Sequence, residues 1–177
     1  MPWLAAFVCA FLALAPASAQ VSGRAFQGFA GDGDGGPINI EADDLRIEEQ
    51  KGIAVYEGNV VVRRGASTVR TGRLTVEFSA QSGLTQDSID RLRFAGGLVV
   101  TNGDNVITAD GGRFNVRTEE VLLTGKVVVS QGDNVAKGCK LVADMRTNRA
   151  RLEGCPVKGR KKGRVQSVFT PGSTPSN

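Results

Sequence analysis

One stretch of the chain recurs: Tyr56-Glu57-Gly58-Asn59-Val60-Val61-Val62-Arg63-Arg64-Gly65. Second and third copies run from Leu92 to Gly103 and from Leu123 to Gly132, and all three copies carry a second glycine seven positions after the central one. The central glycines of copies two and three and of a degenerate fourth copy are evenly spaced, at Gly96, Gly125 and Gly154. A constant period of this length is typical of a repeat architecture.

Every second residue in the first three copies is apolar or glycine, which is the period of a β-strand with one buried face. Matching strands precede or follow the copies, with inward residues at Leu45, Ile47, Leu74, Val76, Phe78, Phe114, Val116, Leu141, Ala143 and Met145. The alternate positions carry charges at Arg46, Glu57, Arg73, Glu77, Arg93, Arg113, Arg117, Lys126 and Lys140. The pattern predicts two sheets around one apolar interior with a charged exterior, bent at the same height in each layer by the central glycines.

Order is expected to begin at Pro37, because residues 38–43 alternate between apolar and polar like a strand. Residues 102–105 and 131–134 are tight-turn signals between β-rich runs. The polar segment Ser79 to Asp90 is the one expected interruption of the strands, and no stretch has the period of an amphipathic helix. We therefore predict an all-β domain over residues 37–169.

Residues 1–19 have the features of a signal peptide. An apolar run from Leu4 to Ala15 precedes an Ala17-Ser18-Ala19 cleavage motif, so that the exported chain would begin at Gln20. A membrane anchor is the alternative, but it needs about 20 apolar residues. Residues 20–36 are rich in glycine and are expected to form a flexible leader, because a calcium loop would need more oxygen ligands than they offer.

Two cysteines, Cys139 and Cys155, lie in the expected exported chain. In an oxidising compartment such a pair predicts a disulfide, with two reduced, buried thiols as the alternative. The chain has no histidine, which removes the commonest general base and metal ligand, and no paired carboxylates mark a catalytic cleft. A binding or structural protein is therefore favoured over an envelope hydrolase.

A basic cluster, Lys158 to Arg164, separates the fourth copy from a last expected strand at Val165–Phe169. The cluster is interpreted as a solvated hairpin loop, with contact to the phosphates of an anionic lipid as the alternative. Nucleic acid is not expected as a partner, because the chain carries an export signal and no aromatic residues interleave with the basic ones. Residues 170–177 are expected to form a disordered tail.

The periodicity leaves two interpretations of the interior open. A closed sandwich would pack only against itself and would serve as a structural scaffold of an envelope complex. An interior that opens would accept an apolar ligand instead. Alternation of residue types specifies which side chains point inward, and it does not specify how far apart the two sheets lie.

The export signal, an opening strand of type Ile-x-Ile-x-Ala-Asp-x-Leu at Ile38–Leu45 and the repeated unit resemble the OstA-like family over residues 37–169. The resemblance implies an open antiparallel β-jellyroll of V-shaped section, located in the periplasm. It implies protomers joined head to tail, with LptC-like inner-membrane and LptD-like outer-membrane components as partners. Kinship with the periplasmic domains of LptC or LptD is the alternative within the family.

Lipopolysaccharide is the ligand that the resemblance implies, with the acyl chains of lipid A in the apolar interior and no cofactor or metal. Residues expected to contact these chains are Ile38, Ile40, Tyr56, Val60, Val62, Leu74, Val76, Phe94, Leu98, Val100, Phe114, Val116, Val127 and Val129. The fourth copy departs from the pattern, since Pro156 and Lys158 replace apolar residues at inward positions. The cysteine pair and the basic cluster are not part of the family motif.

Overall fold

The structure, a computed structural model, describes residues 36–157 and 163–170. The predicted signal peptide and its cleavage site, residues 20–35 of the expected leader, most of the basic cluster and residues 171–177 lie outside this described part. Its strands are β1 (Asn39–Glu41), β2 (Asp44–Glu48), β3 (Ile53–Arg64), β4 (Ser67–Phe78), β5 (Ile89–Asn102), β6 (Asn105–Ala109), β7 (Gly111–Asn115), β8 (Glu120–Gln131), β9 (Asn134–Asp144), β10 (Arg149–Glu153) and β11 (Gln166–Val168). Two short 3-10 helices, η2 (Glu49–Lys51) and η3 (Gln86–Ser88), complete the described elements.

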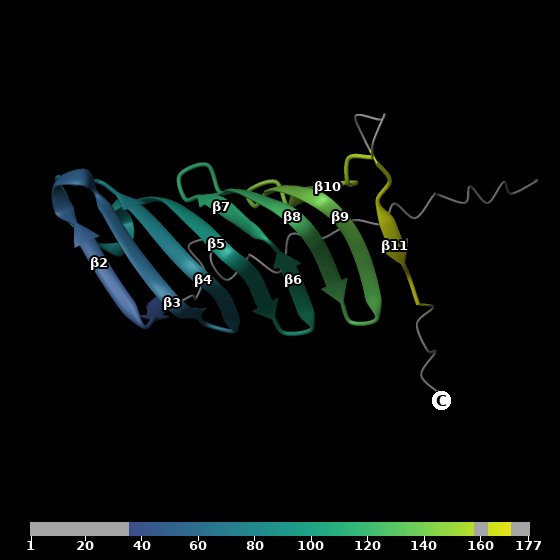
Figure 1. The fold of residues 1–177 in the computed structure, drawn as a ribbon, viewed down its shortest axis with the longest axis horizontal. Helices are drawn as coiled ribbons and strands as arrows, with labels where there is room; N and C mark the ends of the chain where they lie inside the picture. Colours follow the sequence, from purple (N-terminus) through teal and green to yellow (C-terminus); the bar gives the residue numbers. More distant parts are fainter. Residues whose placement is uncertain (1–35, 158–162, 171–177) are drawn as a thin grey trace, which may run out of the picture.

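All pairings between the strands are antiparallel, and the strands follow one another along the long axis of the molecule from β2 to β11 (Figure 1). The register divides each long strand into two halves. The first half of β3 pairs with β2 and its second half pairs with β1. In the same way, β5 and β8 pair with β7 along one half and with β6 along the other.

The halves form two layers that face each other. We call layer A the residues 44–57, 73–78, 89–95, 111–124 and 140–153, and layer B the residues 39–41, 60–71, 98–109, 127–138 and 166–168. Side chains from both layers meet in one apolar core. The all-β fold predicted from the sequence, an antiparallel β-jellyroll, is confirmed.

A line of bulges crosses the strands where the two layers join, and we call this line the crease. The register of β3 with β4 shifts between Glu57 and Val60, and that of β8 with β9 shifts between Thr124 and Val127. Gly58 and Gly125 have φ values of 77° and 97° at these shifts, a backbone region that residues with a side chain disfavour. The bulges therefore lie where the central glycines predicted a bend.

An aspartate packs beside Gly58 at the crease. Asp43 interrupts the path from β1 to β2, and its backbone N–H donates to the carbonyl oxygen of Gly58 at 3.0 Å. Its carboxylate accepts a hydrogen bond of 2.8 Å from the side-chain amide of Asn59. A methyl group on Gly58 would lie only 2.9 Å from the Asp43 Cβ. The Asp43 side chain therefore occupies the space that a side chain at position 58 would need.

Asp110 repeats this arrangement between β6 and β7. We call each place where the sheet bends at the crease a corner, and the two that contain Asp43 with Gly58 and Asp110 with Gly125 the aspartate corners. Its carboxylate accepts from the backbone N–H of Lys126 at 3.2 Å, and a Cβ on Gly125 would overlap its side chain. At the strand pair between these two corners, a glycine replaces the aspartate, and a Cβ on Gly72 would lie 3.0 Å from the carbonyl oxygen of Gly96. The crease therefore contains two kinds of corner. In one kind an aspartate side chain packs against the glycine, and in the other two backbone segments lie in close contact.

The later glycine of each copy forms the hairpin turn at the far end of its strand. Gly65, Gly103 and Gly132 have φ values of 55°, 55° and 54° and follow β3, β5 and β8. Both tight-turn signals are therefore confirmed, because each of these turns needs the left-handed backbone that glycine supplies.

One expectation about the faces is wrong, and another is incomplete. Leu45 and Ile47 were predicted to be buried, but they are 45% and 46% exposed, because β2 is the last strand of layer A and the short strand β1 does not cover it. The exterior is charged on layer A, whereas on layer B exposed charged residues such as Arg63, Arg70 and Lys137 share the outer face with uncharged ones. The outer face of layer B carries half-buried valines, because β-branched residues favour strands on either face; they are Val61, Val99, Val106, Val128 and Val135.

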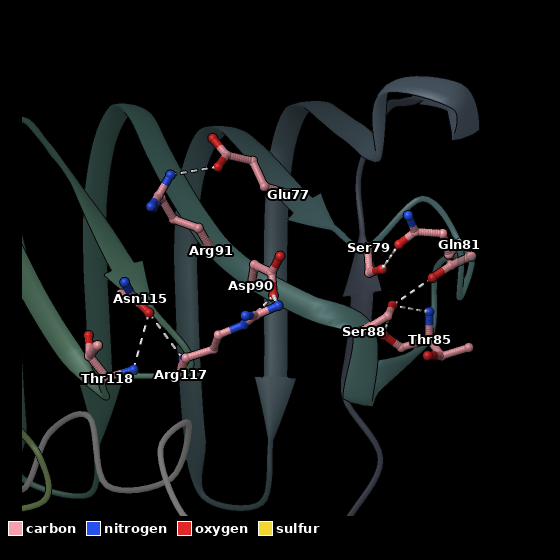
Figure 2. Close-up of polar contacts among 11 residues, drawn as sticks. Glu77, Ser79, Gln81, Thr85, Ser88, Asp90, Arg91, Asn115, Arg117 and Thr118 are labelled. Carbon is pink, nitrogen blue, oxygen red and sulfur yellow. Dashed lines mark hydrogen bonds and ion pairs between the residues drawn. The ribbon is translucent and has the colours of Figure 1, made fainter.

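The expected interruption at Ser79 to Asp90 is observed as a loop over residues 79–88 that contains η3 (Figure 2), whereas Ile89 and Asp90 already belong to β5. Ser88 is buried and fastens the loop, since its hydroxyl donates to the carbonyl of Gly83 at 2.6 Å and accepts from the N–H of Thr85 at 2.9 Å. Beside it, Asp90 binds Arg117 at 2.6 Å. These contacts hold the entry of β5 against the end of β7, and Leu84 of the loop packs against the apolar core.

Candidate functional site

The space between the two layers is the candidate site. All fourteen residues predicted to contact lipid lie in the apolar core or pack against it. Eight of them are buried, namely Val60, Val62, Leu74, Val76, Leu98, Val100, Phe114 and Val127. The other six are partly buried, namely Ile38, Ile40, Tyr56, Phe94, Val116 and Val129. The structure brings the whole set into one interior, where most members are covered by one another.

A cavity of about 330 Å³ remains between the layers beside β1. Ile38, Ile40 and Val62 contribute its wall from the side of layer B, and Leu92 and Phe114 contribute from layer A. The rim is polar, formed by Arg64, Gln86, Asp87 and Glu119. The volume is at the lower end of the range for ligand pockets, and an apolar wall with a polar rim suits an amphiphile whose polar part stays in water.

The interior is also uncovered at the end formed by β2. Leu45 and Ile47 pair in register with Tyr56 and Ala54, so all four side chains are on the inner face of layer A. Tyr56 and Ala54 are covered, whereas Leu45 and Ile47 are nearly half exposed. The apolar interior therefore continues to an open edge where another apolar surface could extend it.

Among the described residues, the interior between the layers is formed mainly by apolar side chains. Its buried polar residues on layer B are Ser67 and Thr71, and the Thr71 hydroxyl donates to the carbonyl of Gly97 at 2.7 Å. In residues 36–157 and 163–170, no group of three or more His, Cys, Asp or Glu side chains is placed to hold a metal ion. The described part of the chain also contains no helix of the length and apolarity needed to cross a membrane. The apolar side chains of the described interior are suited to contact with apolar groups.

Tyr56 provides a spectroscopic probe of the interior, because it is the single tyrosine of the chain. Burial raises the pKa of the Tyr56 phenol above its ordinary value of about 10. We expect the absorbance of tyrosinate to appear at higher pH in the folded protein than in urea. The contribution of the neutral phenol to the free energy of unfolding is fully present below the pKa of the unfolded state. It is lost as the pH rises from that value through the pKa of the folded state. Equal titration curves in buffer and in urea would show that the ring is solvated.

Reasoning from the sequence missed two groups of residues. Asp43 and Asp110 were not recognised, although each follows an alanine and lies at the same interval before its central glycine, Gly58 or Gly125. Several core residues were also left out of the lipid-contact set, although they share the inward parity of their neighbours; they are Val69, Ile107, Val121, Leu123 and Leu141. The repeated Ala-Asp pair was the available signal for the two aspartates. Inward parity was the available signal for the omitted core residues.

A disulfide joins Cys139 on β9 to Cys155 after β10, with the two Cα atoms 4.7 Å apart. The bond lies at the crease, next to Gly138, and holds the chain that leaves β10 against β9. Further along, β11 returns to the same strand and pairs with Val135, Ala136 and Lys137. The C-terminal end of the sheet is therefore organised around β9.

Comparisons with known proteins agree with this geometry. The chain is 34% identical over 172 residues to an uncharacterized protein of Rhizobium meliloti (strain 1021), a match that covers 95% of this chain and 89% of the relative. Its fold is similar to the crystal structure of LptH, the LptA homologous periplasmic component of the lipopolysaccharide transport device from Pseudomonas aeruginosa. That match has a TM-score of 0.60 at 20% identity and covers 76% of this chain and 96% of LptH.

Residues 39–149 match the family described as LptA/(LptD N-terminal domain) LPS transport protein. The matched segment begins at β1, ends at the start of β10 and includes the three intact repeat copies together with both aspartate corners. It covers more than half of the chain, and the family is one of transport proteins rather than enzymes. The chain therefore belongs to the LptA/LptD N-terminal family of lipopolysaccharide transport proteins.

Proposed function

We propose that this protein carries lipopolysaccharide through the periplasm by shielding its acyl chains between layers A and B. The proposal rests mainly on one observation: the inward residues form a continuous apolar interior that reaches a cavity beside β1 and an uncovered edge at β2. The fourteen residues predicted from the sequence would supply the contacts. The sugars and phosphates of the ligand would stay outside the apolar interior.

Acyl chains need such a shield because exposure to water costs about 0.8 kcal/mol per CH2 group, or on the order of 10 kcal/mol for one chain of ordinary length. Valine, leucine and isoleucine make non-directional contacts that are similar at every level of the stack. A chain would therefore gain nearly the same free energy at successive positions. Such a flat free-energy profile allows movement along the interior without a trap at one site.

Entry of a chain requires the layers to separate, because residues such as Val60 and Val100 have no exposed surface. The crease is the part of the fold suited to this movement. Its glycines tolerate wide changes of φ and ψ, and its bulges already interrupt the ladder between the two halves of each strand. We propose that the sheet opens at the crease as a chain enters.

The ends of the sheet are suited to extend the shield. In the described part of the chain, β1 and β2 pair only with β3, while β10 and β11 pair only with β9, so both ends present unpaired strand edges. Strand addition at such edges can join proteins, and a head-to-tail contact between copies need not close into a ring. We propose joints of this kind with further copies and with LptC-like and LptD-like components, in a protein exported after cleavage between Ala19 and Gln20.

Photo-crosslinking tests the location of the lipid. Photoreactive side chains at Ile40 and Phe94, both half-buried and inward, are expected to capture lipopolysaccharide in cells. The matched controls are their neighbours Asn39 and Arg93, which are exposed on the outer face. Capture from the outer positions alone would contradict binding in the interior.

A lipid-free scaffold is the second candidate function. The burial of eight of the fourteen predicted contact residues favours it, because these side chains already satisfy one another. A scaffold would show no lipid adduct at Ile40 or Phe94, and its protein partners would still be crosslinked through the strand edges. The same experiment therefore separates the two functions.

A further inference from the structure

A second pocket lies outside the apolar interior, on the outer face near the C-terminal end of the crease. Its volume is about 580 Å³. Three cations line it, each from a different segment: Lys126 on β8, Lys137 on β9, and Arg164 in the chain that leads to β11. None of the described residues that line this pocket is acidic. We call it the basic pocket.

The ion pairs of the sheet set the basic pocket apart. Several cations on the outer face of layer A are neutralised by nearby carboxylates, as Arg73 is by Glu57 at 2.5 Å and as Arg91 and Arg93 are by Glu77 at 2.8 and 2.7 Å. By contrast, Lys126, Lys137 and Arg164 have no ion pair with any residue in the described ranges. Three uncompensated charges that share one concave surface raise the local concentration of anions.

The pocket also has an apolar part and a fixed frame. Val128 pairs in register with Lys137, which in turn pairs with Gln166, so the three side chains form one row across β8, β9 and β11. Val157 is 55% exposed at the pocket and follows Cys155, whose disulfide to Cys139 attaches this segment to β9. The cations therefore lie beside an apolar wall on a covalently anchored frame.

The geometry points to a binding site for a phosphate group carried on a sugar, in which Lys126, Lys137 and Arg164 surround the phosphate and Val128 and Val157 contact the sugar ring. Arginine and lysine donate charge-assisted hydrogen bonds to phosphate oxygens, and the volume exceeds what a single phosphate needs. A phosphorylated sugar occurs both free and as the headgroup of a glycolipid. Assigning the site to the glycolipid rests on the proposed function, whereas recognition of the sugar phosphate does not.

The site is tested first with a soluble probe. The exported chain with its disulfide intact is titrated with glucose monophosphate and with glucose at constant ionic strength, and amide chemical shifts are followed by NMR. We expect shifts at Lys126, Val128 and Lys137 with the phosphate alone. The double variant K126E/K137E should lower the affinity by roughly tenfold or more, since two charge-assisted bonds are replaced by repulsion.

The control is R70E/R149E, which changes the net charge equally. Arg70 and Arg149 are exposed, have no ion pair with a described residue and do not line the basic pocket. The affinity of R70E/R149E for glucose monophosphate should change by less than about twofold. Neither residue lines the pocket, and salt screens interactions between charges more than about 8 Å apart. Equal losses in both double variants, or the absence of shifts at the pocket, would overturn the site. Binding of an acidic peptide but not of the sugar phosphate would overturn it in favour of a protein partner.

Lipopolysaccharide before and after enzymatic dephosphorylation then distinguishes the sources of the phosphate. The native protein should prefer the phosphorylated form, and K126E/K137E should lose this preference while the photoreactive side chain at Ile40 still captures acyl chains. Loss of headgroup preference with acyl capture retained supports the basic pocket. Retained preference in the variant would overturn the assignment to the glycolipid, and loss of acyl capture in the native protein would contradict only the proposed function.

Discussion

Gly125→Ala is expected to destabilise the protein by roughly 3 kcal/mol, because two penalties coincide at this corner. The residue has a φ of 97°, which strains any residue with a Cβ, and the new methyl group would overlap Asp110. The change should appear as a lower midpoint of urea unfolding at an unchanged slope. Under the proposed function, lipid capture at Ile40 should fall in the same variant, because the bulge at Gly125 lies where the two layers join.

Gly132→Ala is the matched control for this prediction. Its φ of 54° is also left-handed, but a methyl group there would meet nothing within 4 Å, so the expected loss is about 1 kcal/mol. Adding Asp110→Ala to Gly125→Ala should remove the overlap, so that the double variant loses less stability than the two single variants together. Equal losses for Gly125→Ala and Gly132→Ala would show that the aspartate gives way and that the corner is not tightly filled.

Replacing both disulfide cysteines by serine is expected to lower the free energy of unfolding by about 3 kcal/mol, the value for a loop of this size. Cys139 and Cys155 have a sequence separation of 16, and Cys155 is exposed, so little packing is lost with the sulfur atoms. The loss should be local at first, with faster hydrogen exchange in β9, β10 and β11 than in β3 and β4. A reductant should have the same effect on the native protein and no further effect on the double variant.

Detection of two free thiols in protein purified from the periplasm under non-reducing conditions would contradict this prediction. Retention of β11 on β9 in the double variant would also limit the role of the bond. In that case the three register pairs of β11 and the hydrogen bond from the Thr170 backbone to Asn134, 3.1 Å long, would suffice to hold the C-terminal end.

The strand pattern was predictable because two local signals agreed at each repeat. Alternation specified the inward side of β3, and the glycine seven positions after Gly58 specified where the chain turns back. Burial of Leu45 was not predictable in this way, since it depends on whether a facing strand is long enough to cover β2. That property belongs to the assembled stack and not to the local sequence.

The site was predictable only in part, for a related reason. Parity assigned residues such as Val60 and Leu98 to the interior, and both are there. It could not tell whether these side chains leave room for a ligand, because the distance between the layers depends on corner geometry contributed by distant residues. Asp110 shows this best: it sets the corner at Gly125 through contacts with a later strand, and the alternation of apolar residues does not point to it.

The spacing of the two aspartate corners determines the steps in which the sheet could become longer or shorter by gain or loss of repeats. The same interval along the chain separates Asp43 from Asp110, Gly58 from Gly125, and the turn glycine Gly65 from Gly132. The unit that repeats, with one aspartate corner and one corner of close backbone contact, is therefore a pair of hairpins. It contributes four strands to each layer, and the described fold contains two such units, which we call modules. With strands about 4.8 Å apart, inserting or deleting one module would change the length of the stack in steps of roughly 19 Å, while a single hairpin would place an aspartate corner where close backbone contact is needed.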